Sequence, residues 1–277
     1  MRIEKVGTTF AAEITDVDLG DLSEPDFDKI ATAFTDFEVI FIRDQQLTPD
    51  QHIAFAERWG KIDINRFFTP VADYPQIAEV RKEPDQLVNI GGGWHTDHSY
   101  DRKPAMGSIL VARELPASGG DTMFASMTAA YLSLPEDVKK QIASLSAVHS
   151  NEHVFGANAA YQQSDLKDAF SGEDQVGRTV HPLVIKHPRS GRKVLYVNPG
   201  FTIGIDGWSE DDSQELMTTL YEHAMAPDHI CRMSWAPGTI AMWDNRATWH
   251  YAINDYHGER RLMHRITVEG CALEAFP

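Results

Sequence analysis

Short apolar runs, separated by glycine, proline and polar residues, dominate the central and C-terminal parts of the chain. Runs of this length that are rich in β-branched and aromatic residues predict strands. Helices do not alternate regularly with these runs. We therefore expect a mainly β protein with flanking helices, a β-sandwich or jelly roll, and not a doubly wound parallel sheet. The predicted strands span residues 38–43, 77–82, 107–114, 179–187, 193–198, 239–244 and 261–270.

Helical periodicity occurs in four segments. Apolar residues recur at three- and four-residue spacing within 25–37, which predicts an amphipathic helix. Residues 48–51 form a capping box with proline at the first helical position. This box begins a helix that we expect to reach Trp59, with Gly60 as its C-terminal cap. The other two helices are predicted at 135–145 and 209–225.

The organisation along the chain indicates one domain over residues 1–277. No internal repeat, low-complexity tract or linker divides it. Two segments, near 66–94 and 151–178, fit the strand and helix patterns poorly. Loops of this length are usually functional or mobile. Both segments are candidate lids over a site, and the alternative that they are plain surface loops stays equally open.

Charge and composition exclude several classes of protein. The chain has 25 Lys and Arg against 41 Asp and Glu, a net charge of −16, which repels the phosphates of nucleic acids. No apolar run approaches the roughly 18 residues that cross a membrane, and the N-terminus has no apolar signal segment. The 2 cysteines provide neither a disulfide framework nor a thiolate metal site. These features predict a cytoplasmic protein without nucleic-acid or membrane partners.

The segment His95-Thr96-Asp97 places an imidazole and a carboxylate two residues apart. On a strand, both side chains would point to the same face. With a third ligand from elsewhere they could form a two-histidine, one-carboxylate metal site, as in non-haem iron oxygenases. Composition alone predicts about two such His-x-Asp/Glu matches by chance. The chain has two, the second at His257-Gly258-Glu259 in a predicted turn, so spacing by itself is a weak indication.

A short basic stretch, residues 260–265, stands out in this acidic chain. Arg261 and Arg265 are four residues apart, so on a strand both would face one side, with Met263 between them. Two readings remain open for this pair. The arginines could form surface salt bridges, or they could capture two anions in one cavity, because guanidinium groups suit carboxylates and sulfonates.

Five motifs follow one another along nearly the whole chain. They are DQQLTPDQH at 44–52, WHTD at 94–97, GGDT at 119–122, WDNR at 243–246 and RLMHR at 261–265. With these motifs and the separation of His250 from Arg261, the chain resembles the taurine dioxygenase family of Fe(II)/2-oxoglutarate-dependent enzymes. That family also contains aryloxyalkanoate and alkylsulfate dioxygenases.

The resemblance implies a fold, a set of cofactors and a set of roles. The family fold is a double-stranded β-helix, a form of jelly roll, and its members are commonly dimers or tetramers. The cofactor is Fe(II), the cosubstrates are 2-oxoglutarate and O2, and the coproducts are succinate and CO2. By this resemblance His95, Asp97 and His250 ligate Fe(II), Thr122 and Arg261 hold the distal carboxylate of 2-oxoglutarate, and Arg265 holds the acidic group of a small anionic organic substrate.

The chain departs from the taurine-specific members at two positions. It has Gly91 where they carry an asparagine, and Asn65 where they carry a histidine that contacts the sulfonate. These differences argue against taurine itself. Bulky residues at 67–68 indicate a pocket for an aryl- or alkyl-bearing carboxylate, sulfonate or sulfate ester. We expect Asn65, His98 and Tyr100 to contact that substrate.

Two other functions stay open on the sequence alone. A metal-dependent hydrolase or isomerase could use the same three ligands with Zn2+ or Mn2+. It would not need Thr122 together with Arg261. A non-catalytic binding protein could share the scaffold, although complete ligand positions argue against it.

Overall fold

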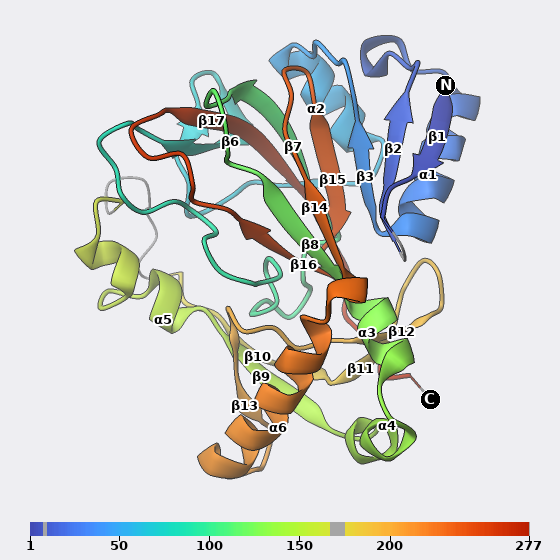
Figure 1. The fold of residues 1–277 in the computed structure, drawn as a ribbon, viewed down its shortest axis with the longest axis vertical. Helices are drawn as coiled ribbons and strands as arrows, with labels where there is room; N and C mark the ends of the chain where they lie inside the picture. Colours follow the sequence, from blue (N-terminus) through green and yellow to red (C-terminus); the bar gives the residue numbers. More distant parts are fainter. Residues whose placement is uncertain (8–9, 167–174, 277) are drawn as a thin grey trace.

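The structure, a computed structural model, describes residues 1–7, 10–166 and 175–276. Its main feature is a nine-stranded sheet in the order β1-β2-β3-β15-β7-β17-β6-β5, with β4 paired to β17 (Figure 1). All pairs are antiparallel except β2 with β3. The strands of this main sheet are β1 (Arg2–Lys5), β2 (Ala12–Thr15), β3 (Val39–Ile42), β4 (Ile62–Asp63), β5 (Pro70–Val71), β6 (Tyr74–Lys82), β7 (Gly107–Glu114), β15 (Ile240–Asp244) and β17 (Arg261–Val268).

Within the described residues, three smaller antiparallel sheets accompany the main sheet. The one that matters most for the site is β14-β8-β16, which we call the minor sheet. It consists of β8 (Thr122–Ser126), β14 (Ile230–Met233) and β16 (Thr248–Ala252). The other two contain β9 (Ser146–Ser150), β10 (Arg178–Pro182) and β13 (Thr202–Ile205), and β11 (Val184–Lys186) with β12 (Lys193–Leu195).

The helices flank these sheets. Figure 1 shows α1 beside the β1–β3 edge of the main sheet and α4 and α6 at the opposite end of the molecule. In the described residues, no helix combines the length and the apolar composition that crossing a membrane requires. The helices are α1 (Glu24–Phe37), α2 (Pro49–Glu57), α3 (Met127–Ser133), α4 (Glu136–Ile142), α5 (Glu152–Phe155) and α6 (Glu210–Ala224), with 3-10 turns η1 (Leu19–Asp21), η2 (Ala160–Gln163) and η4 (Pro227–His229).

Strand β3 shows how both faces of the main sheet are buried. Ile40 and Ile42 pack in a core that includes Phe34 of α1. The alternate residue Phe41 packs in a second core, between the main and minor sheets, where its ring centroid lies 5.8 Å from that of Phe124. A strand buried on both faces has a continuous apolar sequence, because neither side meets water. The predicted mainly β architecture with flanking helices is confirmed.

The second helix ends earlier than predicted. Its capping box at Thr48 is present, but α2 stops at Glu57 and the cap residue is Arg58 in a right-handed conformation. Gly60 is therefore not the cap. Trp59 leaves the helix because its indole fills an aromatic cluster, with its ring centroid 5.1 Å from that of Phe34. Tertiary packing outweighs the helical pattern there.

The strand predicted at 179–187 is two strands in different sheets. β10 ends at Pro182, and β11 begins at Val184. Proline has no amide hydrogen to continue a ladder. Between them Leu183 is buried and donates its backbone N–H to the carbonyl of Leu145, which takes the chain from one sheet to the next.

The two lid candidates differ in structure. The first, near 66–94, contains β5 and β6, which belong to the main sheet, so its irregular parts are 66–69 and 83–94. The second, near 151–178, contains α5 and η2, and its residues 167–174 lie outside the described residues. Movement of either segment stays a prediction.

The buried residue His149 should make the folded protein less stable as the pH falls. Burial, followed by the nearby His181, lowers the pKa of His149 from 6.5 to about 3. The unfolded chain therefore binds a proton at this residue between about pH 6.5 and pH 3, and the folded chain does not. Because of this group, the free energy of unfolding should be about 2 kcal/mol lower at pH 5 than at pH 7.5. His149→Gln should reduce that loss, measured by urea unfolding at both pH values; an equal loss in variant and wild type would contradict it.

Candidate active site

Three side chains converge between the main and minor sheets. One ligand atom from each of His95, Asp97 and His250 lies within 4.8 Å of the other two. The Nε2 atoms of His95 and His250 lie 3.7 Å from Oδ1 and Oδ2 of Asp97, respectively. Asp97 and His250 are buried, and His95 is partly buried. Two imidazoles and one carboxylate form a donor set that fits a first-row divalent metal such as Fe(II).

The backbone brings these residues together in a way that the sequence did not predict. His95 and Asp97 are not two residues of one strand. His95 forms an isolated bridge with His250, in which each backbone N–H donates to the other's carbonyl at 3.2 and 2.8 Å. Asp97 lies at the start of the turn region that follows, just before the turn that the Asp101 N–H closes on the carbonyl of His98. Backbone pairing between distant segments therefore sets the geometry, and the strand arrangement considered for His95 and Asp97 is not present.

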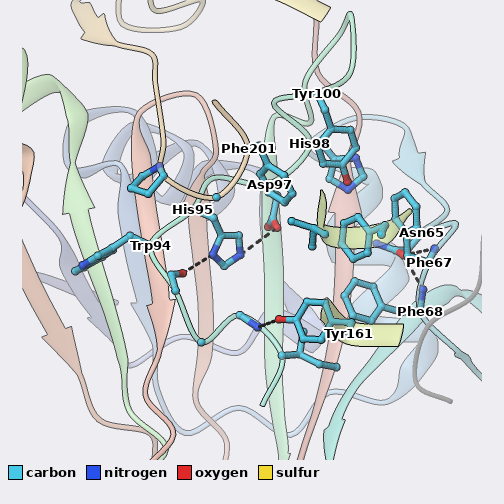
Figure 2. Close-up of a pocket in the computed structure, with 18 of the residues that line it drawn as sticks. Asn65, Phe67, Phe68, Trp94, His95, Asp97, His98, Tyr100, Tyr161 and Phe201 are labelled. Carbon is cyan, nitrogen blue, oxygen red and sulfur yellow. Dashed lines mark hydrogen bonds and ion pairs between the residues drawn. The ribbon is translucent and has the colours of Figure 1, made fainter. Parts of the chain in front are cut away.

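Neighbouring groups orient two of the three donors, His95 and Asp97, whereas Nδ1 of His250 has no hydrogen-bond partner among the described residues. The Nδ1 atom of His95 donates to the carbonyl of Gly93 at 2.7 Å, which leaves Nε2 to face Asp97 (Figure 2). The Ser108 hydroxyl donates to Oδ2 of Asp97 at 3.2 Å. Burial lowers the pKa of His250 well below its usual value, so its imidazole is neutral and can bind a metal. Partners of this kind fix the direction of metal ligands.

Arg265 supplies the positive charge next to the carboxylate. Its Nη2 atom lies 3.0 Å from Oδ2 of Asp97, and both side chains are buried. Burial alone would raise the pKa of Asp97, but Arg265 and then His250 outweigh burial and hold that pKa well below its usual range. Asp97 is therefore an anion at neutral pH. The Nε atom of Arg265 has no hydrogen-bond partner among the described residues.

A second buried arginine lies on the same face of β17. Arg261, Met263 and Arg265 are all buried, which agrees with both arginines facing one side, and among the described residues neither arginine forms a surface salt bridge. Within the described part of the chain, Nε and Nη2 of Arg261 lack hydrogen-bond partners. Burial lowers the pKa of Arg261, the direction expected when a cation lacks an anion. The two nitrogen atoms without partners fit a ligand carboxylate.

Thr122 and Arg261 both contact the indole of Trp235. The indole of Trp235 donates from Nε1 to Oγ1 of Thr122 at 3.0 Å. The Arg261 Cζ atom lies 5.5 Å from the centroid of the same indole. In the minor sheet Thr122 pairs with Ala252, two residues beyond His250, so threonine and histidine share a face. The residues expected to hold the metal and the carboxylate are thus adjacent in the sandwich interior.

A cavity of about 290 Å³ opens beside the metal donors. Figure 2 shows aromatic side chains around it, and its wall also contains His95, Asp97 and Arg265. Neither Arg261 nor Thr122 belongs to that wall. The structure thus separates the two buried arginines: one faces the cavity, and the other lies away from it. The large aromatic residues of the wall are Phe67, Phe68, Trp94, Tyr100, Phe155, Tyr161 and Phe201.

The three residues expected to contact substrate all line this cavity. The side-chain oxygen of Asn65 accepts from the backbone N–H groups of Phe67 and Phe68 at 2.9 and 3.0 Å, so it shapes a turn. His98 is buried, and its Nδ1 lies 3.0 Å from Oδ2 of Asp101. Burial raises the pKa of Tyr100, which keeps its hydroxyl protonated.

Sequence reasoning missed several residues of the site. Ser108 is a polar residue inside the apolar run of β7, which is a signal for a buried hydrogen bond. Trp235, Phe155, Tyr161 and Phe201 reach the site only through tertiary packing, and their local sequence carries no signal for it.

Non-haem iron dioxygenases that use 2-oxoglutarate are the class in which this fold and this donor set occur together. A profile of the family described as "Taurine catabolism dioxygenase TauD, TfdA family" matches residues 2–267. The chain belongs to this family, and it is a 2-oxoglutarate-dependent dioxygenase. The expected jelly-roll fold and enzyme class are confirmed, and the hydrolase, isomerase and binding-protein alternatives are not supported.

Individual relatives agree with this assignment. An alkylsulfatase of Acinetobacter baylyi is 35% identical over 98% of this chain and 85% of its own length. An (S)-phenoxypropionate/alpha-ketoglutarate-dioxygenase of Sphingobium herbicidovorans is 31% identical over 97% of this chain and 94% of its own. The crystal structure of a taurine dioxygenase from Burkholderia xenovorans superposes with a TM-score of 0.83, at 30% identity, over 99% of this chain and 91% of that one.

Proposed function

We propose that this dioxygenase hydroxylates a small organic anion: a carboxylate, sulfonate, sulfate ester or aryloxyalkanoate. The observation that carries the proposal is the pair of buried arginines on one face of β17, of which only Arg265 reaches the cavity. Two anions are bound in such an enzyme, the cosubstrate and the substrate. Arg261 would serve the first and Arg265 the second.

His95, Asp97 and His250 would hold Fe(II). Their convergence supports this role, and so does the fixed orientation of His95 by the Gly93 carbonyl. When bound, Fe(II) with 2-oxoglutarate and O2 supplies the oxidising chemistry, with succinate and CO2 as coproducts. The chain's own residues position the reactants and keep water away. Trp243, for example, is buried with its ring centroid 4.7 Å from that of His250.

Thr122 and Arg261 would hold the distal carboxylate of 2-oxoglutarate. The unpartnered Nε and Nη2 atoms of Arg261 support this role, because a buried donor without a partner costs free energy until a ligand supplies one. Thr122 would add a hydroxyl from the facing sheet. Together they would fix the cosubstrate from the side away from the cavity.

Arg265 would hold the acidic group of the substrate, while the aromatic wall would hold its organic part. The unpartnered Nε of Arg265 supports the first role, and a cavity of about 290 Å³ whose wall is rich in aromatic residues supports the second. His98 and Tyr100 would add polar contacts, and Asn65 would act chiefly by shaping the wall. The names of the two relatives agree with a sulfate ester or an aryloxyalkanoate.

The proposal includes a homo-oligomer, either a dimer or a tetramer. Light scattering after size exclusion tests this part, and a monomer mass at working concentration would contradict it.

Succinate formation tests the proposed function. Purified enzyme with Fe(II), O2 and 2-oxoglutarate is supplied with matched sulfonates, alkyl sulfates, aryloxyalkanoates and plain carboxylates, and with uncharged analogues as controls. We expect at least one anion to stimulate succinate formation and to be oxidised in proportion. Stimulation by an uncharged analogue equal to that of the matched anion would contradict the anionic substrate.

Replacing Arg265 should separate substrate from cosubstrate. Arg265→Ala should weaken binding of the stimulating anion roughly 10- to 100-fold, because a hydrogen bond to a charged group is lost. Slow succinate formation without product should persist, since Arg261 is intact. The variant leaves Asp97 buried without its cation, so the metal-free melting temperature should fall, and Mn2+ should recover part of it.

The matched control for this variant is Arg260→Ala. Arg260 directly precedes β17, is half-exposed, and pairs with Glu83 and Glu114. The Arg260→Ala variant should leave anion binding unchanged. If Arg265→Ala lowers the melting temperature but keeps wild-type affinity for the anion, Arg265 only supports Asp97.

A further inference from the structure

The side chain of His95 is enclosed by two glycine-containing turns. A Cβ atom on Gly200 would lie 2.5 Å from Cβ of His95, so only glycine allows that turn to pack so closely. On the other side, a Cβ atom on Gly91 would lie 3.3 Å from Cε1 of His95, and the φ angle of Gly91 is +79°. The imidazole therefore has little room to rotate while both turns keep their places.

One short stretch of chain holds both turns. In α5, Nε2 of His153 donates to the carbonyl oxygen of Gly200 at 2.8 Å. In η2, the Tyr161 hydroxyl accepts from the backbone N–H of Gly91 at 3.4 Å (Figure 2). The two turns are more than 100 residues apart in the sequence, but both are attached to residues 152–163.

The same stretch forms part of the cavity wall. Val154, Phe155 and Tyr161 line the cavity. The ring of Phe155 stacks on that of Phe67, another residue of the cavity wall, with centroids 4.3 Å apart and an interplanar angle of 12°. The segment that contacts a molecule in the cavity is thus the segment that holds the turns around His95.

We propose that His153 and Tyr161 are positioning residues for His95, acting through Gly200 and Gly91. This inference rests on the proposed role of His95 as a metal ligand. His153 keeps the 198–201 turn against the root of the side chain, and Tyr161 keeps the Gly91 turn against the ring edge that carries Nε2. The enzyme then binds its metal tightly only while residues 152–163 lie over the cavity.

The test measures metal affinity in variants that keep the fold. Binding of Mn2+ in the presence of 2-oxoglutarate is followed without O2 by the loss of the free Mn2+ signal in electron paramagnetic resonance. Partners that bond a ligand directly change metal affinity by about 10- to 100-fold. Because His153 and Tyr161 act through a turn, His153→Phe and Tyr161→Phe should each raise the Kd for Mn2+ about threefold to tenfold.

Two further variants distinguish positioning from a general effect. His153→Gln keeps a side-chain N–H and should recover most of the affinity. Glu152→Gln changes the exposed neighbour of His153 in the same helix and should bind Mn2+ like the wild type. The melting temperatures of the two His153 variants should stay close to that of the wild type, because the side chain of His153 is exposed.

The outcomes separate this inference from the proposed function. If the wild type binds no Mn2+, the metal site itself is contradicted. If the wild type binds Mn2+ and both phenylalanine variants bind it equally well, only the positioning role is overturned. An equal loss in Glu152→Gln, or no recovery in His153→Gln, would also overturn it.

Discussion

Replacing Arg261 with alanine should raise the 2-oxoglutarate concentration needed for half-maximal succinate formation by roughly thirtyfold or more. The guanidinium is buried, and two of its nitrogen atoms have no hydrogen-bond partner among the described residues. A cosubstrate carboxylate that lost this partner would stay buried without its charge-assisted hydrogen bonds. Losses of this kind typically cost about 2–5 kcal/mol. Initial rates at a fixed Fe(II) concentration, over a range of 2-oxoglutarate, measure the effect.

Two other variants serve as comparisons for Arg261→Ala. Thr122→Val should act in the same direction but more weakly, because it removes one neutral hydroxyl. Arg260→Ala, next to Arg261 but half-exposed and paired with glutamates, should leave the 2-oxoglutarate requirement unchanged. An unchanged requirement in Arg261→Ala would assign the cosubstrate to another residue.

Replacing Asp97 with asparagine should abolish tight metal binding and also destabilise the protein. The amide has the same shape but no negative charge, so the donor set loses its only anion. The change also leaves the buried guanidinium of Arg265 without its partner at 3.0 Å. Breaking a buried ion pair by removing one partner typically costs about 3–5 kcal/mol. Titration with Mn2+ and urea unfolding of the metal-free protein measure the two effects separately.

Asp101→Asn provides the matched control for Asp97→Asn. Asp101 is a partly buried carboxylate four residues away, paired with Arg66 at 2.7 Å and outside the donor set. Its loss should lower stability but keep Mn2+ binding. Wild-type Mn2+ affinity in Asp97→Asn would remove Asp97 from the metal site.

The sequence predicted those features that depend on local periodicity. Arg261 and Arg265 face one side because they are four residues apart on a strand, and β17 has that geometry. The capping box at Thr48 begins α2 as expected, because its hydrogen bonds join residues three apart. The metal ligands came from a resemblance carried by motifs, since the His-x-Asp spacing alone is no more frequent than chance.

Features that depend on contacts between distant segments were not predictable. His95 and Asp97 converge with His250 through a bridge across the chain, not through a shared strand. Strands β8 and β16, which carry Thr122 and His250, were not predicted as strands. The pairing of Arg265 with Asp97 joins residues 168 positions apart, and no local pattern encodes it.

The most direct test of the central claim is a crystal structure of the protein grown without O2 with Mn2+ and 2-oxoglutarate. The account predicts an anomalous peak bonded to His95, Asp97 and His250, at distances of about 2.0–2.2 Å. It also predicts the far carboxylate of 2-oxoglutarate on Arg261 and leaves Arg265 facing the cavity. A metal bound elsewhere, or a 2-oxoglutarate whose far carboxylate lies on Arg265, would contradict the account.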